Sequence, residues 1–276
     1  MHSYLRSIGF SDIKNRRQLT PITKEIIANP TTKNIVTVDA DTRLVQLNKD
    51  FGKHFGISLV GEMDIDNTIS FEYYFPYVRS SFIMNQERIY IEKHGDKESY
   101  AGVCEDYYAN TKWMNYSNHL ITKAYMSGLS TNGKVILDIE QLPPANREHK
   151  RSSANRNKLI EAARQGDRSA MESLTLDDMD VYTQVSRRAH YEDILSIVET
   201  NFMPYGIETE HYTIIGNILD CSLCENDYTK EPVYLLNVET NEMLMAIAIN
   251  EKDLLGTPAP GRRFKGEIWL QGNVIF

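Results

Sequence analysis

A short stretch near the carboxyl end combines basic and aromatic residues. Two arginines and a lysine lie close to two large rings, in the order Arg262, Arg263, Phe264, Lys265 and Trp269. Guanidinium groups bind phosphates and carboxylates, and aromatic rings stack on flat ligands. The rest of the region from 207 to 276 is mainly acidic, so we predict the ligand-binding site at these five residues. The alternative is a turn whose arginines balance the surrounding negative charge.

A Cys-x-x-Cys pair, Cys221 and Cys224, lies downstream of His211 and raises the question of a metal or redox site. A structural zinc site needs about four ligands, and the sequence holds no second pair of this kind. A redox pair is expected to open a helix after a strand, whereas these cysteines end a predicted strand. The three residues are the candidates for a metal site, but we favour packing within the strand and expect no metal and no cofactor.

The sequence lacks the usual motifs of catalysis and nucleotide binding, including Gly-x-Ser-x-Gly, His-Glu-x-x-His, the P-loop and Gly-x-Gly-x-x-Gly. Our first hypothesis is therefore a non-catalytic binding or regulatory protein whose ligand is a protein or a small molecule, with an oligonucleotide as the less favoured alternative. The second is a hydrolase whose histidine and carboxylate groups come together from distant segments. The third is a structural component that forms a homodimer through an apolar face of a helix at 190–202.

Composition limits the compartment and the partners. The chain has 276 residues, 41% of them hydrophobic, and a net charge of −8. Nucleic-acid-binding proteins usually present a basic surface, so a nucleic-acid partner is disfavoured. Three cysteines are too few for a disulfide framework. The first residues do not form a signal peptide, and no apolar run reaches the roughly 20 residues of a membrane span. We therefore expect a cytoplasmic protein with no membrane partner.

The amino-terminal region, residues 1–145, is predicted to be an α+β domain. A helix is expected to start with Thr20 as its cap and Pro21 at its first helical position, and to end at Asn29 before Pro30. Apolar residues on either side of a polar turn predict a hairpin over 35–47. Residues 111–126 are compatible with helix or strand. Further strands are predicted at 57–63, 68–75, 87–93, 99–105 and 134–140.

The remaining chain is predicted to form a helical connector and a small β domain. Apolar residues at helical spacing and capping residues favour helices over 150–203. Strands are expected at 210–220, 232–239, 242–250 and 263–276, which is the pattern of a small barrel of the OB or SH3-like kind over 205–276. The predicted class is α+β, with an antiparallel sheet in the first domain, the helical connector, and the barrel-like domain at the carboxyl end.

Several stretches of the sequence are distinctive: YLRSIGF at 4–10, ESLTLDD at 172–178, FMPYG at 202–206, and PGRRFKG at 260–266 followed by WLQG at 269–272. Together they resemble an uncharacterised domain-of-unknown-function family of cytosolic proteins from anaerobic Gram-positive bacteria. The resemblance implies a bacterial cytosolic protein, assigns no activity and transfers no catalytic residue.

Overall fold

The computed structural model describes residues 2–37, 43–79, 87–94, 97–99, 103–104, 119–136, 200–205, 210–241 and 243–275. The chain divides into two compact units. One consists of Met1–Leu137 and Thr200–Phe276, and the other of Asp138–Glu199. All of the described residues belong to the first unit.

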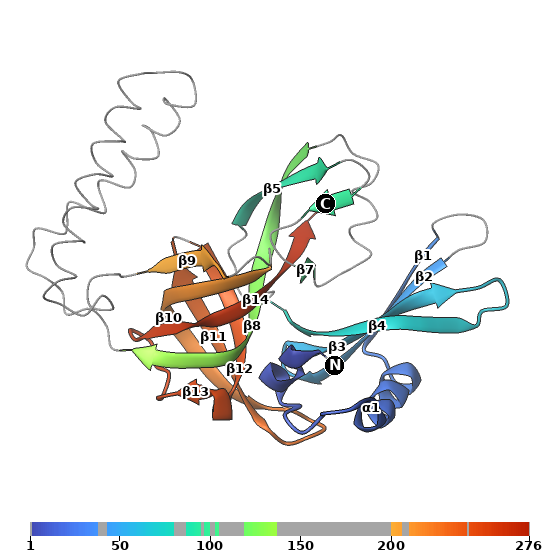
Figure 1. The fold of residues 1–276 in the computed structure, drawn as a ribbon, viewed down its shortest axis with the longest axis horizontal. Coiled ribbons are helices and arrows are strands. Elements are labelled where there is room, and N and C mark those ends of the chain that lie inside the picture. Colours follow the sequence, from blue (N-terminus) through green and yellow to red (C-terminus); the bar gives the residue numbers. More distant parts are fainter. Residues whose placement is uncertain are drawn as a thin grey trace, which may run out of the picture. The chain divides into compact units, whose positions relative to one another are not determined.

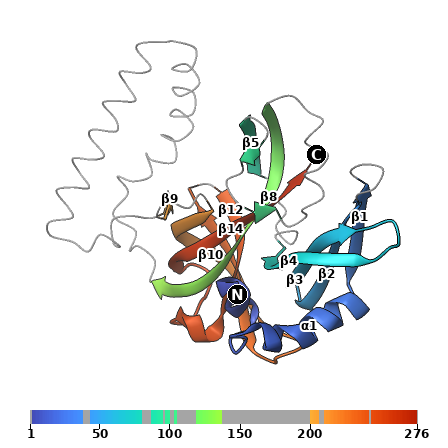
Figure 2. The same cartoon turned by 45° about the vertical axis from the view of Figure 1, so that its right-hand side comes forward.

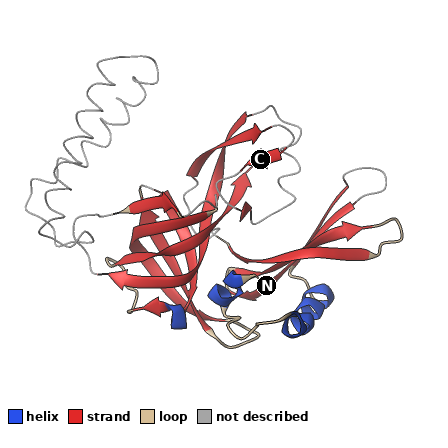
Figure 3. Cartoon of the chain, in the orientation of Figure 1, coloured by secondary structure: helices blue, strands red, loops and turns tan. Residues whose placement is uncertain are grey.

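The predicted α+β class with a helical connector is wrong, because the described residues are mostly strands (Figure 3). They form a four-stranded antiparallel sheet and a closed five-stranded barrel with additional short strands. The predicted connector, 150–203, lies outside the described residues except at its end. There Asn201–Pro204 forms strand β9, which pairs with the barrel strand β10 (His211–Glu225) and is not helical. Strand pairing thus overrides the helical spacing of the apolar residues at this end.

The four-stranded sheet has the order β1 (Thr32–Thr37), β2 (Arg43–Gly52), β3 (Phe55–Met63) and β4 (Ile69–Val78). The predicted hairpin over 35–47 is confirmed, since β1 and β2 pair with Thr37 opposite Arg43. Strand β3 is buried over almost its whole length, which suits a central strand between two neighbours. Strand β4 forms one edge of this sheet.

Helix α1 (Arg16–Ala28) lies against this sheet and contacts β2 and β3 (Figure 1). It begins earlier than predicted, because Asn15 and Gln18 form a reciprocal capping box that satisfies the first backbone N–H groups. Pro21 consequently lies inside the helix and not at its first position. The buried side of α1 consists of Leu19, Ile22 and Ile26.

The barrel closes through a strand that the carboxyl-terminal region does not contain. The ring runs through β8 (His119–Ile136), β12 (Met243–Asn250), β11 (Pro232–Thr240), β10 and β14 (Arg263–Ile275), and β14 pairs with β8 to complete it. Figures 1 and 2 show the long strand β8 running beside β14. Residues 119–126, predicted as either helix or strand, are therefore strand.

Short elements extend the barrel sheet. Strand β5 (Glu87–His94) pairs with β8 and confirms the strand predicted at 87–93. The others are β6 (Lys97–Ser99), β7 (Val103–Cys104) and β13 (Leu254–Leu255), which follows the 3-10 segment η4 (Glu251–Asp253). No helix among the described residues is long and apolar enough to cross a membrane.

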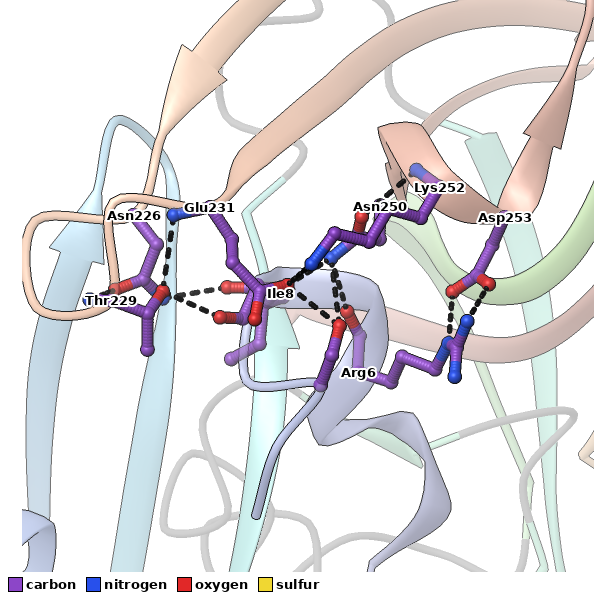
Figure 4. A network of polar contacts seen from close by, with 10 residues as sticks. Arg6, Ile8, Asn226, Thr229, Glu231, Asn250, Lys252 and Asp253 are labelled. Atoms are coloured by element: carbon purple, nitrogen blue, oxygen red, sulfur yellow. Dashed lines mark hydrogen bonds and ion pairs between the residues drawn. The ribbon is translucent and has the colours of Figure 1, made fainter.

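The amino-terminal segment is held against the barrel by a network of polar contacts (Figure 4). The segment contains the 3-10 helix η1 (Ser3–Ile8). The Glu231 carboxylate accepts hydrogen bonds from Ser11 Oγ at 2.6 Å and from Asn250 Nδ2 at 2.7 Å. Arg6 donates from two nitrogens to the two oxygens of Asp253, both at 2.5 Å. Bidentate pairing of this kind fixes orientation as well as distance.

The turn that ends η1 is held by a buried asparagine. Asn226 Nδ2 donates to the carbonyl of Ile8 at 2.7 Å, and Thr229 Oγ1 donates to the carbonyl of Gly9 at 2.6 Å. Gly9 has a φ of +85°, and a Cβ there would lie 2.9 Å from the Asn226 Cβ. The chain therefore needs glycine at this position, both for its left-handed backbone and for space.

A side-chain amide joins the barrel to the edge strand β4. Gln271, which is 1% exposed, donates from Nε2 to the carbonyl of Pro76 at 2.8 Å and accepts from the N–H of Val78 at 3.2 Å. The amide thus pairs with β4 in the way that a neighbouring strand would. Since residues two apart point the same way along a strand, the backbone groups of Tyr74, Pro76 and Val78 face this edge.

Candidate functional site

A groove of about 760 Å³ lies between α1, the segment before it, and the strands β3 and β4. Its volume falls within the range of about 300–1,000 Å³ that is typical of small-ligand sites. Leu19 from the helix and Leu59 from β3 form its buried apolar part. The groove brings together segments far apart in the sequence, because α1 packs on the face of the sheet next to its β4 edge.

Three cations line the helix side of the groove. Lys14, Arg16 and Lys24 are exposed, and none of them forms an ion pair with a carboxylate in the part of the chain that the structure describes. Glu72 is the one carboxylate among the described residues that line the groove. Three cations and one carboxylate leave two positive charges here, in a chain whose net charge is −8. The groove is therefore suited to an anion.

Aromatic side chains form the strand side of the groove. Phe71, Tyr73 and Tyr74 come from β4, where the pairing with β3 shifts so that Glu72 is an extra residue. Tyr74 lies opposite Leu59 and Phe71 lies opposite Gly61, and partners across a pair of strands share a face. The bulge thus places Phe71 and Tyr74 on the face that α1 covers, although they are three positions apart.

His2 lines the groove where it meets the barrel. Its ring lies 4.4 Å from the Trp269 ring, and its backbone N–H donates to the hydroxyl of Tyr74 at 3.3 Å. The His2 Nδ1 atom is buried and has no hydrogen-bond partner among the described residues. Burial lowers the pKa of the His2 imidazole to about 4. The imidazole is therefore neutral at pH 7.

The depressed pKa of His2 predicts a loss of stability in acid. The unfolded chain takes up a proton near pH 6.5 and the folded chain only near pH 4, so stability is full above 6.5 and falls as the pH drops toward 4. In urea denaturation, wild type should lose about 1–3 kcal/mol more than His2→Phe between pH 7 and pH 4. Phenylalanine keeps a ring next to Trp269 but does not titrate. Equal losses in the two proteins would contradict the burial of this imidazole.

Comparison with known protein families identifies the chain. A family model described as "Domain of unknown function, E. rectale Gene description (DUF3881)" matches residues 5–272. The chain belongs to the DUF3881 family. This match confirms the resemblance that the sequence shows to a family of unknown function from anaerobic Gram-positive bacteria. Neither a curated protein nor a solved structure matches the chain.

The five residues predicted as the ligand site of this DUF3881 protein lie in different surroundings. Phe264 is 0% exposed inside the barrel, whereas Trp269 is 6% exposed and belongs to the core shared with the four-stranded sheet. Arg262 is exposed and donates to the carbonyl of Thr257 at 2.7 Å, Arg263 is buried, and Lys265 is half-buried. The structure thus brings Trp269 next to the groove through His2 but keeps Phe264 away from it.

The candidate metal ligands are also separated. Cys221 packs against the barrel interior, where its Sγ lies 3.6 Å from the carbonyl oxygen of Pro258, and Cys224 packs against the core shared with the four-stranded sheet. His211 lies at the other end of β10, 5.7 Å from the Tyr4 ring. Burial, together with the charge of Asp220, raises the pKa of the Cys221 thiol, which lowers its reactivity.

Sequence reasoning missed the residues that line the groove. Arg16 and Lys24 belong to α1, and the aromatic residues belong to β4, far along the chain. One local signal was available. The run Phe71-Glu72-Tyr73-Tyr74 breaks the apolar–polar alternation of a half-buried strand, which is how a bulge appears in a sequence.

Proposed function

We propose that this DUF3881 protein is a non-catalytic binding or regulatory protein of the bacterial cytosol, and that the groove between α1 and β4 binds an anionic ligand. One observation carries the proposal: three cations without carboxylate partners among the described residues face an aromatic wall in an otherwise acidic chain. Cations bind anions, and rings supply apolar contact area for the rest of the ligand. The cytosolic location rests on the low cysteine content.

The composition of the groove supports binding over catalysis. Nucleophilic catalysis needs a nucleophile, a base and a group that orients the base. Among the described residues that line the groove, His2 is the one histidine and Glu72 the one carboxylate, and the hydroxyl groups of Thr20 and Thr23 on α1 have no histidine–carboxylate pair assigned to activate them. Among all described residues, no three histidine, cysteine or acidic side chains gather in a group that could hold a metal ion. The homodimer hypothesis stays a prediction, because residues 190–199 lie outside the described part.

An aromatic anion tests the proposal directly. We use 8-anilino-1-naphthalenesulfonate, which carries flat rings and one sulfonate, and measure its fluorescence on titration with protein. Wild type should bind it at one saturable site. Arg16→Glu with Lys24→Glu should weaken this binding at least about tenfold, since two attractive charges become repulsive, and added salt should reduce the difference.

The matched control changes the same charges outside the groove. Arg17 and Lys33 are exposed and do not line the groove. Arg17→Glu with Lys33→Glu therefore alters net charge by the same amount and should leave the affinity within about twofold. If both double variants bind the dye equally well, the groove is not the anion site.

A further inference from the structure

The positive charges along the groove are spread over a distance that one small anion cannot span. Arg16 and Lys24 are eight positions apart on α1, which corresponds to about 12 Å along the helix axis. Lys14 extends the row beyond Arg16. A ligand that contacts both ends must therefore be elongated and carry negative charge in at least two places. This argument rests on the groove being the anion site of the proposed function.

The edge of β4 supplies the other half of the recognition surface. Gln271 shows that backbone groups on this edge pair with an amide, since it bonds Pro76 and Val78 there. Tyr74 faces the same edge and also lines the groove. Proline at position 76 fits this geometry. Pro76 lies opposite Ile57 of β3, but its backbone faces away from β3, so the missing N–H costs no hydrogen bond between the two strands. An extended chain in the groove can thus continue the pairing that Gln271 begins.

We propose that the groove binds an extended acidic peptide, which adds to the β4 edge as a strand and pairs its carboxylates with the cations of α1. A strand rises about 3.3 Å per residue, so the 12 Å between the charges corresponds to about four residues. Side chains at i, i+2 and i+4 share one face of a strand. The ligand carries acidic residues at i and i+4, with an apolar residue at i+2 above Phe71 and Tyr74.

A peptide is favoured over a single-stranded nucleic acid. Both could stack on the rings and neutralise the cations, but a peptide also uses the backbone groups of the edge strand, which a nucleic acid does not match. Outside the groove the net charge of the chain is strongly negative and repels a polyphosphate backbone. A peptide with two carboxylates carries little enough charge to avoid this repulsion.

Fluorescence polarisation with labelled synthetic peptides tests the spacing. The probe is Thr-Glu-Thr-Val-Thr-Glu-Thr with blocked ends, in which the glutamates lie at i and i+4. The control has the same composition, but one glutamate is exchanged with its neighbouring threonine, so the two carboxylates fall on opposite faces. The full-length wild type should bind the first at least about fivefold more tightly. Equal affinities, or tighter binding of oligo(dT) than of the first peptide, would overturn the proposal.

Two N-methylated versions of the first peptide test strand addition. In one version the three threonines after the first residue are methylated on their backbone nitrogens, and in the other version valine and the two glutamates are. A strand that adds to an edge uses the N–H groups of alternate residues, so one version should lose binding at least tenfold and the other should keep it. Equal effects of the two versions would exclude strand addition.

The dye titration separates failure of this inference from failure of the proposed function. If the naphthalenesulfonate binds in the manner that depends on Arg16 and Lys24 while no peptide binds, the peptide inference is wrong and the anion-binding groove stands. If binding of the dye does not depend on Arg16 and Lys24 either, both the peptide inference and the proposed function are wrong. Arg16→Glu with Lys24→Glu should abolish binding of the first peptide, and Arg17→Glu with Lys33→Glu should not.

Discussion

Replacement of Asn226 with alanine should lower the free energy of unfolding by about 3 kcal/mol. The residue is fully buried, its Nδ2 donates to the carbonyl of Ile8, and its Oδ1 accepts from the backbone N–H groups of Tyr228 and Thr229. Alanine leaves one carbonyl and two N–H groups without these partners. A buried polar group that loses its partner costs about 1–3 kcal/mol. Urea denaturation followed by circular dichroism measures the loss.

Two further variants separate the role of the buried amide from a general effect of losing asparagine. Asn29 is exposed and its amide donates to Glu25 at 3.2 Å, so Asn29→Ala should change stability by no more than about 0.5 kcal/mol. Asn226→Asp keeps the acceptor for the two N–H groups but places a carboxylate oxygen against the Ile8 carbonyl. It should cost at least about 2 kcal/mol. An aspartate variant as stable as wild type would rule out the contact with Ile8.

Secondary-structure elements could be predicted from the sequence where neighbouring residues alone specify them. The hairpin of β1 and β2 follows from apolar residues on both sides of a polar turn, and β5 follows from the alternation of Ile89 and Ile91 with polar neighbours. The start of α1 was misplaced because Thr20 before Pro21 also fits the pattern of a cap. Asn15 with Gln18 was the correct signal and could have been found.

Closure of the barrel could not be predicted, because it depends on pairing between strands that are far apart in the sequence. Strand β8 pairs in parallel with β12 and antiparallel with β14, both of which lie more than 100 residues further along the chain. Gly128 and Gly133 weaken a strand on propensity alone. In the barrel, large side chains from β14 and β12 fill the space that the two missing side chains leave.

The two rings of the predicted ligand site lie on different faces of β14 for a reason that the sequence contained. Phe264, Ile268 and Leu270 lie at even spacing along β14 and all three face the barrel interior, so Trp269 has to face the other way. The two rings therefore could not form one stacking surface. The groove, by contrast, depends on the packing of α1 against the four-stranded sheet, which local patterns do not specify.

Gly133→Ala should destabilise the protein by about 2 kcal/mol, and Phe264→Leu should relieve part of that cost. A Cβ at position 133 would lie 2.5 Å from Phe264 Cε2 and 2.9 Å from Ile249 Cδ1. Gly133 on β8 is also the strand partner of Gly266 on β14. The phenylalanine ring fills the space that these two glycines leave, so a methyl group there forces the ring to move. Leucine is smaller and leaves room for it.

The interaction free energy between positions 133 and 264 tests whether β8 and β14 close the barrel, because the two side chains meet only if these strands pair. Phe264→Leu alone should cost about 1–2 kcal/mol, and the double variant should be more stable than the sum of the single effects by at least about 1 kcal/mol. Urea denaturation of the four proteins gives this value.

Gly272 supplies the matched control, because it belongs to the same pair of strands but a Cβ there would lie 3.4 Å from the nearest atom, the carbonyl oxygen of Tyr125. Gly272→Ala should be neutral within about 0.5 kcal/mol and additive with Phe264→Leu, since ordinary van der Waals contact needs no rearrangement. If the effects of Gly133→Ala and Phe264→Leu also add, β8 does not lie against Phe264. The barrel would then be open between β8 and β14, and residues 119–136 would no longer be its fifth strand.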